Sequence, residues 1–315
     1  MQNIRKILIK LLGDFPKKCD LKPKILSKED KGDYYLEKVT FNADKEEIVP
    51  SYVLIPKNIK EKIPALVCIH GHGGFFELGK GKVVGLDTRE KIKESGSHYQ
   101  AIEACKKGFL VIAPDMKCFE ERRPSKEERE RNPYVTDGWY ERLVTMNLIL
   151  QGKCLQTRYV FDLSRTVDYL LTRKEVDKNR IGAFGVSLGG QQTLFLMSFD
   201  KRVKAGVCVC GFSLFKSIIR DNIGHNMAAY IPAMLKYFDM DGVISTIFPR
   251  PLLLIAGDND IIFPIDGVKK AYNIVLKKYK KVKLEDRFKL IVHHDGHSFK
   301  KDKREIAFEW LKKWL

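Results

Sequence analysis

The sequence predicts an α/β fold, in which a mostly parallel sheet carries helices on both faces. Strand-like and helix-like segments alternate along the chain from about residue 65 onwards, and this alternation is typical of parallel sheets. The strand-like segments are short, uninterrupted apolar runs such as 65–69 and 252–256, the pattern of strands buried on both faces. A chain of 315 residues is long enough to form one large domain of this kind.

The N-terminal stretch 1–12 is apolar but is interrupted by Lys10. No small-residue cleavage site follows it, so we predict a short amphipathic helix rather than a secretory signal. We expect residues 1–36 to form a helical extension packed on the core, and residues 37–315 to form a single domain. No apolar stretch approaches the roughly 20 residues that a membrane span requires, and we expect no membrane partner.

The chain contains seven cysteines, an odd number, and several lie inside apolar runs. This pattern favours reduced, buried thiols and a cytoplasmic location over a disulfide framework. Cys208 and Cys210 share one face of a predicted strand, and we expect no other metal ligand near them. The sequence therefore predicts no metal site.

The formal net charge of +17 raises the question of nucleic-acid binding. The most basic stretch, 269–289, has apolar residues spaced as on one face of a helix, so its lysines can form the solvated face. No nucleic-acid-binding motif accompanies it. Hydrophobic residues (44%) and charged residues (31%) occur in the proportions of an ordinary soluble protein. We expect no nucleic-acid partner, and self-association stays open.

The individual elements follow from local patterns in chain order. Two strands, 39–41 and 48–55, flank a polar turn at 42–45, and Pro50 indicates an edge position for the second strand. The last helix is expected to begin at Asp302 as its N-cap and to bury Ile306 and Trp310 among others. The other predicted strands are 65–69, 109–113, 181–184, 205–210, 252–256 and 288–292, and the other predicted helices are 98–106, 155–170, 188–197 and 266–277.

Two long connections interrupt this alternation, at 117–151 and 212–248. Neither has enough apolar residues in a regular pattern to bury a core of its own. We therefore interpret both as cap-like insertions over the ligand site, which lies beyond the carboxyl ends of the strands. They are the segments expected to select the substrate.

One motif joins a predicted strand directly to a predicted helix. A catalytic serine in such a turn sits on a tight, strained elbow, and glycines two residues before and after it remove side chains that would collide. The following helix points its first N–H groups at the site, which favours a developing negative charge. The sequence of the motif is Gly185-Val186-Ser187-Leu188-Gly189-Gly190, and it makes Ser187 the candidate nucleophile.

A serine nucleophile requires a base that a carboxylate orients. In this type of fold the order along the chain is serine, acid, histidine. Asp260 follows the strand 252–256, with Asp258 as a competitor for the same role. His297 follows the strand 288–292 and the flexible Gly296, whereas His293 and His294 are expected to end that strand. We predict Asp260 and His297 as partners of the serine.

The tetrahedral intermediate of acyl transfer needs N–H donors for its oxyanion. The N–H of Leu188 is one candidate, because this residue directly follows the nucleophile. The glycine-rich sequence 70–74 supplies the second candidate, the N–H of His72, because glycines let backbone approach a bound carbonyl. His70 and His72 also resemble a pair of metal ligands, but without nearby carboxylates they form a weak ligand set.

With these residues in place the sequence resembles the α/β-hydrolase superfamily, particularly its dienelactone-hydrolase-like and acetyl-xylan-esterase-like branch. The resemblance extends from about residue 49 to the C-terminus. It implies a carboxylesterase-type serine hydrolase that acts on a small-molecule ester with no metal and no organic cofactor. Its marks are His70-Gly71-His72-Gly73-Gly74, Ala113-Pro114-Asp115, Arg180-Ile181-Gly182, Asp260 before Pro264, and Gly296-His297 before Phe299.

Two features depart from that family pattern. Dienelactone hydrolases carry cysteine at the elbow, where this chain has Ser187. Many relatives have a small Arg-Gly-x-Gly turn after the position of Asp115, where this chain has the sequence 116–123 instead. Within it, Arg122 or Arg123 is a candidate to bind an anionic acid portion of the substrate, and a surface salt bridge is the alternative.

Two other functions compete with ester hydrolysis. A peptidase of the prolyl-oligopeptidase type shares the elbow, but such enzymes usually carry a large N-terminal propeller, and only about 60 residues precede the first core strand here. A non-catalytic protein that binds a ligand under the cap is the second alternative. The intact order of Ser187, Asp260 and His297 argues against it.

Overall fold

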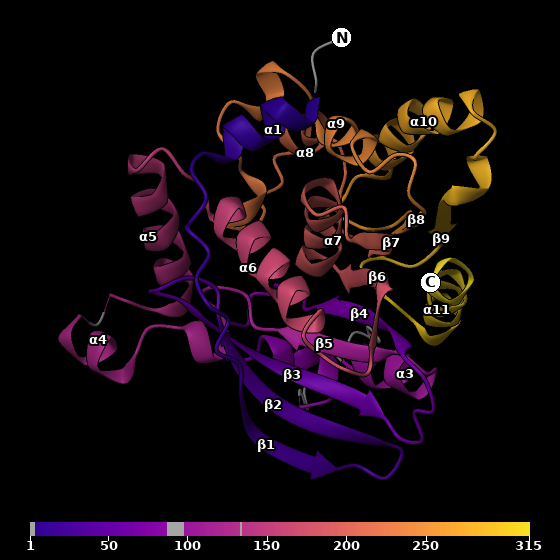
Figure 1. The fold of residues 1–315 in the computed structure, drawn as a ribbon. Helices are drawn as coiled ribbons and strands as arrows, with labels where there is room; N and C mark the ends of the chain where they lie inside the picture. Colours follow the sequence, from indigo (N-terminus) through magenta and orange to yellow (C-terminus); the bar gives the residue numbers. More distant parts are fainter. Residues whose placement is uncertain (1–3, 87–97, 133) are drawn as a thin grey trace.

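The computed structural model describes residues 4–86, 98–132 and 134–315 (Figure 1). A single nine-stranded sheet runs through this part of the chain in the order β1-β2-β3-β5-β4-β6-β7-β8-β9. The strands β5, β4, β6, β7, β8 and β9 pair in parallel, and β1, β2, β3 and β5 pair antiparallel. The predicted fold class is therefore confirmed. The strands are β1 Lys24–Asp30, β2 Tyr34–Asn42, β3 Ile48–Pro56, β4 Ile63–Ile69, β5 Leu110–Pro114, β6 Val176–Val186, β7 Val203–Val209, β8 Leu252–Gly257 and β9 Phe288–His293.

Helices cover both faces of the sheet, and each face has its own apolar core (Figure 1). One core packs the sheet against α6, α7 and α10, which buries side chains such as Tyr159 and Phe195. The other core packs the opposite face against α3 and α11 through side chains such as Phe308. The central strands are buried on both sides, as their continuous apolar runs predict. These helices are α3 Gln100–Lys106, α6 Leu155–Leu170, α7 Leu188–Phe199, α10 Ile265–Lys281 and α11 Lys301–Trp314.

The N-terminal segment differs from the predicted helical extension. The helix α1 spans Ile4–Leu12 and buries Leu8 and Leu12 in the main core, and residues 1–3 of the predicted helix lie outside the described residues. The prediction is wrong further on, because 24–30 form β1, an edge strand of the sheet. All seven residues of β1 are exposed, so the strand lacks the buried face that gives a readable alternation.

Two local predictions are corrected. Strand β3 is not an edge strand, because it pairs with both β2 and β5. Its Pro50 is tolerated there because pairing with β5 begins only at Ser51. In α11 the N-cap is Lys300, so Asp302 lies in the first turn, and Ile306 is exposed rather than buried.

Both connections contain short helices, with α4 and α5 at the left of Figure 1 and α8 and α9 at the top, beside α1. The first contains α4 Lys126–Arg131 and α5 Asp137–Leu150, and the second contains α8 Phe215–Arg220 and α9 Met240–Ser245. The insertions meet where α5 contacts the 3₁₀ turn Met227–Ala229 of the second insertion. Among the helices described, none combines the length and apolar character that crossing a membrane requires.

Candidate active site

Ser187 lies at the junction between β6 and α7, as the motif predicts. Its backbone has φ 59° and ψ −122°, a conformation that residues other than glycine rarely adopt. Its N–H donates to the carbonyl oxygen of Val209 at 2.9 Å, which fixes the elbow against the end of β7. The helix α7 begins at Leu188, whose N–H belongs to the first turn and has no carbonyl partner within the helix.

The glycines of the elbow are required by close backbone contacts. A Cβ atom on Gly185 would lie 2.5 Å from the carbonyl oxygen of Ile69, and one on Gly189 would lie 1.9 Å from the same oxygen. Both distances are shorter than a side chain can tolerate. The elbow is therefore pressed against the end of β4, and the loop after β4 starts beside the serine.

Asp260 and His297 form a hydrogen-bonded pair. The distance between His297 Nδ1 and Asp260 Oδ2 is 2.8 Å. The side chain of Asp260 is 1% exposed and that of His297 is 30% exposed, so the carboxylate is buried and the imidazole reaches the surface of the site. The ring of Phe263 stacks on the imidazole at 5.8 Å between centroids. Since Nδ1 faces the carboxylate, Nε2 is left for a reacting group.

The residues that compete for these two roles, Asp258, His293 and His294, have other surroundings. Asp258 Oδ2 lies 2.7 Å from Nδ1 of His294, whose side chain is 97% exposed. His293 ends β9 and is buried, and burial lowers the pKa of its imidazole. Each aspartate after β8 therefore has its own histidine after β9, but Asp260 and His297 form the pair with the buried carboxylate.

The glycine-rich loop after β4 lies beside the elbow. A Cβ atom on Gly71 would lie 3.7 Å from Cβ of Ser187. The next residue, His72, accepts a hydrogen bond at Nδ1 from the N–H of Gly74 at 3.1 Å. Its imidazole packs edge-on against Phe119. The loop thus brings the backbone of Gly71 beside the serine.

Both insertions contact the loops of the site. From α5, Glu141 accepts a hydrogen bond at 3.2 Å from Nε2 of His72, because Nδ1 of that ring is already an acceptor. From the second insertion, Nε2 of His225 lies 2.8 Å from the carbonyl oxygen of Ile262, in the loop that carries Asp260. The sequence gives no signal for Glu141 or His225, since neither belongs to a motif.

Cys210 corrects the expectation that no metal ligand lies near the cysteine pair. Its Sγ, the Asp260 carboxylate and a His297 ring nitrogen all lie within 4.8 Å of one another. Burial, with the charge of Asp260 as a further cause, raises the pKa of this thiol to about 12. The protonated thiol therefore lies beside the carboxylate that orients His297.

Carboxylates also lie near both histidines of the loop, contrary to the prediction. His70 Nε2 is 3.8 Å from Asp115, and His72 is bonded to Glu141. His70 is fully buried, and its Nε2 accepts the N–H of Met116 at 3.1 Å. Burial holds the pKa of His70 well below its usual value. This imidazole therefore acts as a neutral link between two strand ends.

Arg122 and Arg123 do not form the predicted site for an anionic substrate. Arg122 is buried, and its guanidinium bonds Asp162 at 2.7 Å and Glu47 at 2.8 Å. Arg123 pairs with Asp137 of α5 at 2.9 Å. The alternative of a salt bridge holds for both residues, although the Arg122 pair is buried rather than at the surface.

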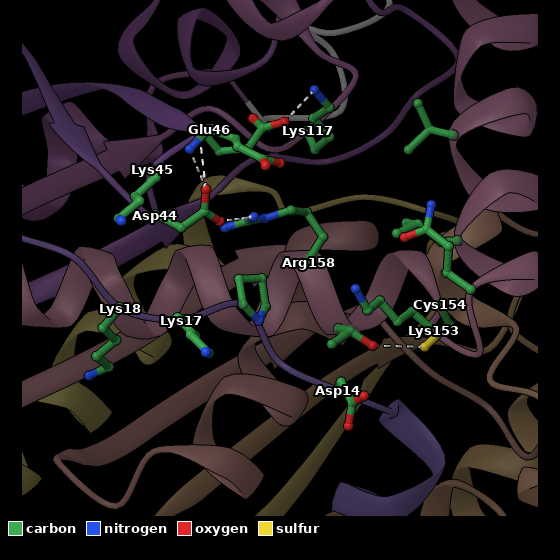
Figure 2. Close-up of a pocket in the computed structure, with 16 residues that line it drawn as sticks. Asp14, Lys17, Lys18, Asp44, Lys45, Glu46, Lys117, Lys153, Cys154 and Arg158 are labelled. Atoms are coloured by element: carbon green, nitrogen blue, oxygen red, sulfur yellow. Dashed lines mark hydrogen bonds and ion pairs between the residues drawn. The ribbon is translucent and has the colours of Figure 1, made fainter.

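A cavity of about 520 Å³ lies on another part of the molecule (Figure 2). It is lined by the N-terminal segment, the β2–β3 turn, the end of the first insertion and α6, and contains none of the three predicted catalytic residues. Arg158 and Asp44 pair with each other across it. Its lining contains both cationic side chains, such as Lys17 and Lys153, and anionic side chains, such as Asp14 and Glu46.

Comparison with known proteins places the chain in a family. A model of the Abhydrolase family matches residues 1–304. The chain belongs to this family. A relative with similarity over the full length of this abhydrolase is YtaP of Bacillus subtilis (strain 168), a protein named as a hydrolase. The two are 28% identical over 314 residues, which cover 99% of this chain and 98% of YtaP.

Solved structures share the fold of this abhydrolase. One, from Bacteroides fragilis NCTC 9343, is named as an acetyl xylan esterase and has a TM-score of 0.73 at 22% identity, covering 93% of this chain and 74% of that one. A glucuronoyl esterase from Solibacter usitatus has a TM-score of 0.70 at 13% identity and covers 99% and 92% of the two chains. These structures confirm the α/β-hydrolase fold.

Proposed function

We propose that this protein is a serine carboxylic-ester hydrolase that acts through an acyl-enzyme. The observation that carries the proposal is the pairing of His297 with the buried Asp260, in loops that follow β8 and β9. Ser187 projects from the end of β6, two strands away from β8 in the same sheet. The carboxyl ends of these parallel strands share one edge, which is where the reaction would occur.

In the proposed reaction Ser187 Oγ attacks the ester carbonyl while Nε2 of His297 takes its proton. His297 then gives that proton to the leaving alcohol, and the acyl group stays bound to the serine. Water attacks the acyl-enzyme with His297 again as the base, and the acid is released. Asp260 holds the imidazole in the required tautomer and stabilises its charged form.

Backbone N–H groups would stabilise the oxyanion in both steps. Leu188 supplies a donor from the first turn of α7, and His72 supplies one from the loop beside Ser187. Donors fixed in advance at the developing charge contribute a large part of such catalysis, about 10²- to 10³-fold for a single group. No metal or organic cofactor takes part in this proposal.

The proposed substrates are small-molecule esters with short, acetyl or aromatic acyl groups. Solved relatives in fold are named as acetyl xylan, glucuronoyl and methyl esterases. Both insertions contact the site, through Glu141 and His225, which supports their role as a cap that selects among such esters. Cytoplasmic location and a single domain over 37–315 belong to the same proposal.

The test is hydrolysis of p-nitrophenyl esters of increasing acyl length by the wild type and by Ser187→Ala. We expect the substitution to lower turnover by several orders of magnitude while the unfolding temperature stays at or above that of the wild type. A fluorophosphonate probe should label the wild type and not the variant. Equal hydrolysis by both proteins would contradict the proposal.

A further inference from the structure

The ammonium group of Lys82 is buried beneath the loop that borders Ser187. Lys82 lies in the 3₁₀ turn Lys80–Val84, and 5% of its surface is exposed. Its Nζ donates to three carbonyl oxygens of that loop, those of Gly71 at 3.2 Å, His72 at 2.8 Å and Phe75 at 2.8 Å. A lysine is rarely buried to this extent without such partners.

These three bonds fix the orientation of the peptide groups. In a trans peptide the carbonyl of one residue and the N–H of the next point in opposite directions. Because the Gly71 carbonyl points at Lys82, the N–H of His72 points away from Lys82. The same holds for the His72 carbonyl and the N–H of Gly73. Gly71 itself lies beside Ser187, since a Cβ atom on it would be 3.7 Å from Cβ of the serine.

The bonds from Lys82 add to those within the loop, where Nδ1 of His70 donates to the carbonyl oxygen of Gly71 at 3.0 Å and the N–H of Gly74 donates to Nδ1 of His72 at 3.1 Å. Gly73 and Gly74 have φ of +61° and +71°, and glycine populates several backbone conformations with similar ease. The ring of Phe119 packs against the ammonium at 5.3 Å to its centroid and against the imidazole of His72. Lys82 is therefore the cation that links three carbonyl groups of this loop.

We propose that Lys82 is a positioning residue that orients the oxyanion donors of this loop. The inference rests on the proposed ester hydrolysis, and it names a residue outside the predicted catalytic set. Its positive charge also polarises the peptide groups whose carbonyls it binds, so their N–H groups become stronger donors to an anion. The effect should be larger in the transition state than in the bound ester, because the negative charge develops only there.

Lys82→Met tests the proposal, because methionine fills similar space without the charge. We expect kcat for p-nitrophenyl acetate to fall about 10- to 100-fold, with KM changed less than about threefold. The inhibition constant of phenylboronic acid, which forms a tetrahedral anion on the serine, should rise by a similar factor. Lys82→Arg, which keeps the charge and donors, should recover part of the lost kcat.

Lys80→Met serves as the matched control. Lys80 is in the same turn and is fully buried, but it bonds the carboxylates of Asp115, Glu120 and Glu121 rather than the loop carbonyls. The Lys80→Met substitution should lower the unfolding temperature, while kcat, measured below that temperature, stays within about threefold of the wild-type value. If Lys82→Met does not fold, Lys82→Gln, which keeps two donors but loses the charge, is measured in the same assays, and kcat should still fall about 10-fold with a similar rise in the boronate constant.

The outcomes separate this inference from the proposed function. A wild type that neither hydrolyses the ester nor reacts with a fluorophosphonate overturns the proposed function and this inference together. An active wild type whose neutral Lys82 variant has unchanged kcat, or unchanged boronate inhibition, overturns the role of Lys82 alone. Equal losses of kcat in the Lys80 and Lys82 variants would also overturn it, because the cause would then be general destabilisation.

Discussion

At the scale of single residues, the site distinguishes two aspartates that are two positions apart. Asp260 has a nearly inaccessible carboxylate bonded to a partly exposed imidazole, whereas Asp258 bonds an imidazole that is almost fully exposed. A carboxylate that orients a base acts best when it is shielded from water, because its interaction with the imidazole is then strongest. The structure thus assigns the two carboxylates different environments.

Asp260→Asn and Asp258→Asn test this distinction. We expect Asp260→Asn to lower kcat by about 10³- to 10⁴-fold, because an amide favours the wrong tautomer of the base. Asp258→Asn should leave kcat within about threefold. Ester hydrolysis by both variants is the measurement, and similar losses in the two would contradict the assignment of Asp260.

The sequence predicts these residues because chain order and strand ends constrain them. Ser187 follows from a local motif, and Asp260 and His297 follow from their positions after the last two strands. Glu141 and Lys82 could not be predicted in this way. Their roles depend on contacts across the fold, and a glutamate in a helix or a lysine in a turn usually lies in solvent.

At the scale of elements, the helix α5 connects the first insertion to the loop after β4. Its residue Glu141 is buried and bonds His72. A movement of α5 would therefore displace the loop beside Ser187. That two long connections follow β5 and β7 could be predicted from the interruption of the strand–helix pattern. Their internal contacts could not, because short helices with weak apolar periodicity do not reveal what they pack against.

Glu141→Leu tests the connection between α5 and this loop. Loss of the hydrogen bond should lower kcat about 3- to 10-fold, since such a bond to a charged group contributes about 1.5–3 kcal/mol and part of the support remains. Amide hydrogen exchange in a peptide covering 70–76 should become faster. Glu141→Gln, which keeps an acceptor oxygen, is the matched control and should behave like the wild type. Unchanged exchange in Glu141→Leu would show that α5 does not support the loop.

At the scale of the whole molecule, a partly buried ion-pair network joins distant parts of the chain. Glu47 in the β2–β3 turn bonds Arg122 and Lys117 of the first insertion, and Arg122 bonds Asp162 of α6. Burial alone would raise the pKa of Glu47, but the charges of Arg122 and Lys117 outweigh it and lower the pKa to about 2. The network therefore couples protonation to folding.

Glu47→Gln tests this coupling through the free energy of unfolding. A pKa near 2 in the folded state lies below the value of about 4.3 in the unfolded state. The carboxylate therefore stabilises the fold above about pH 5, and this contribution disappears as the pH falls towards 2. We expect the variant to be about 2 kcal/mol less stable at pH 7 and closer to the wild type at pH 3, measured by urea denaturation. Glu46→Gln is the control, because Glu46 is exposed; an equal difference at both pH values would contradict the coupling.

The strained backbone of Ser187 has a consequence for how this protein tolerates change. A residue with a side chain at φ 59° and ψ −122° costs folding free energy of order 1–3 kcal/mol, and glycine would fit there without that cost. Optimising the chain for thermal stability alone would therefore favour removing the nucleophile. At the elbow, the residue that would be best for stability and the residue that the proposed reaction needs are therefore different, and the surrounding structure has to hold the strained conformation in place.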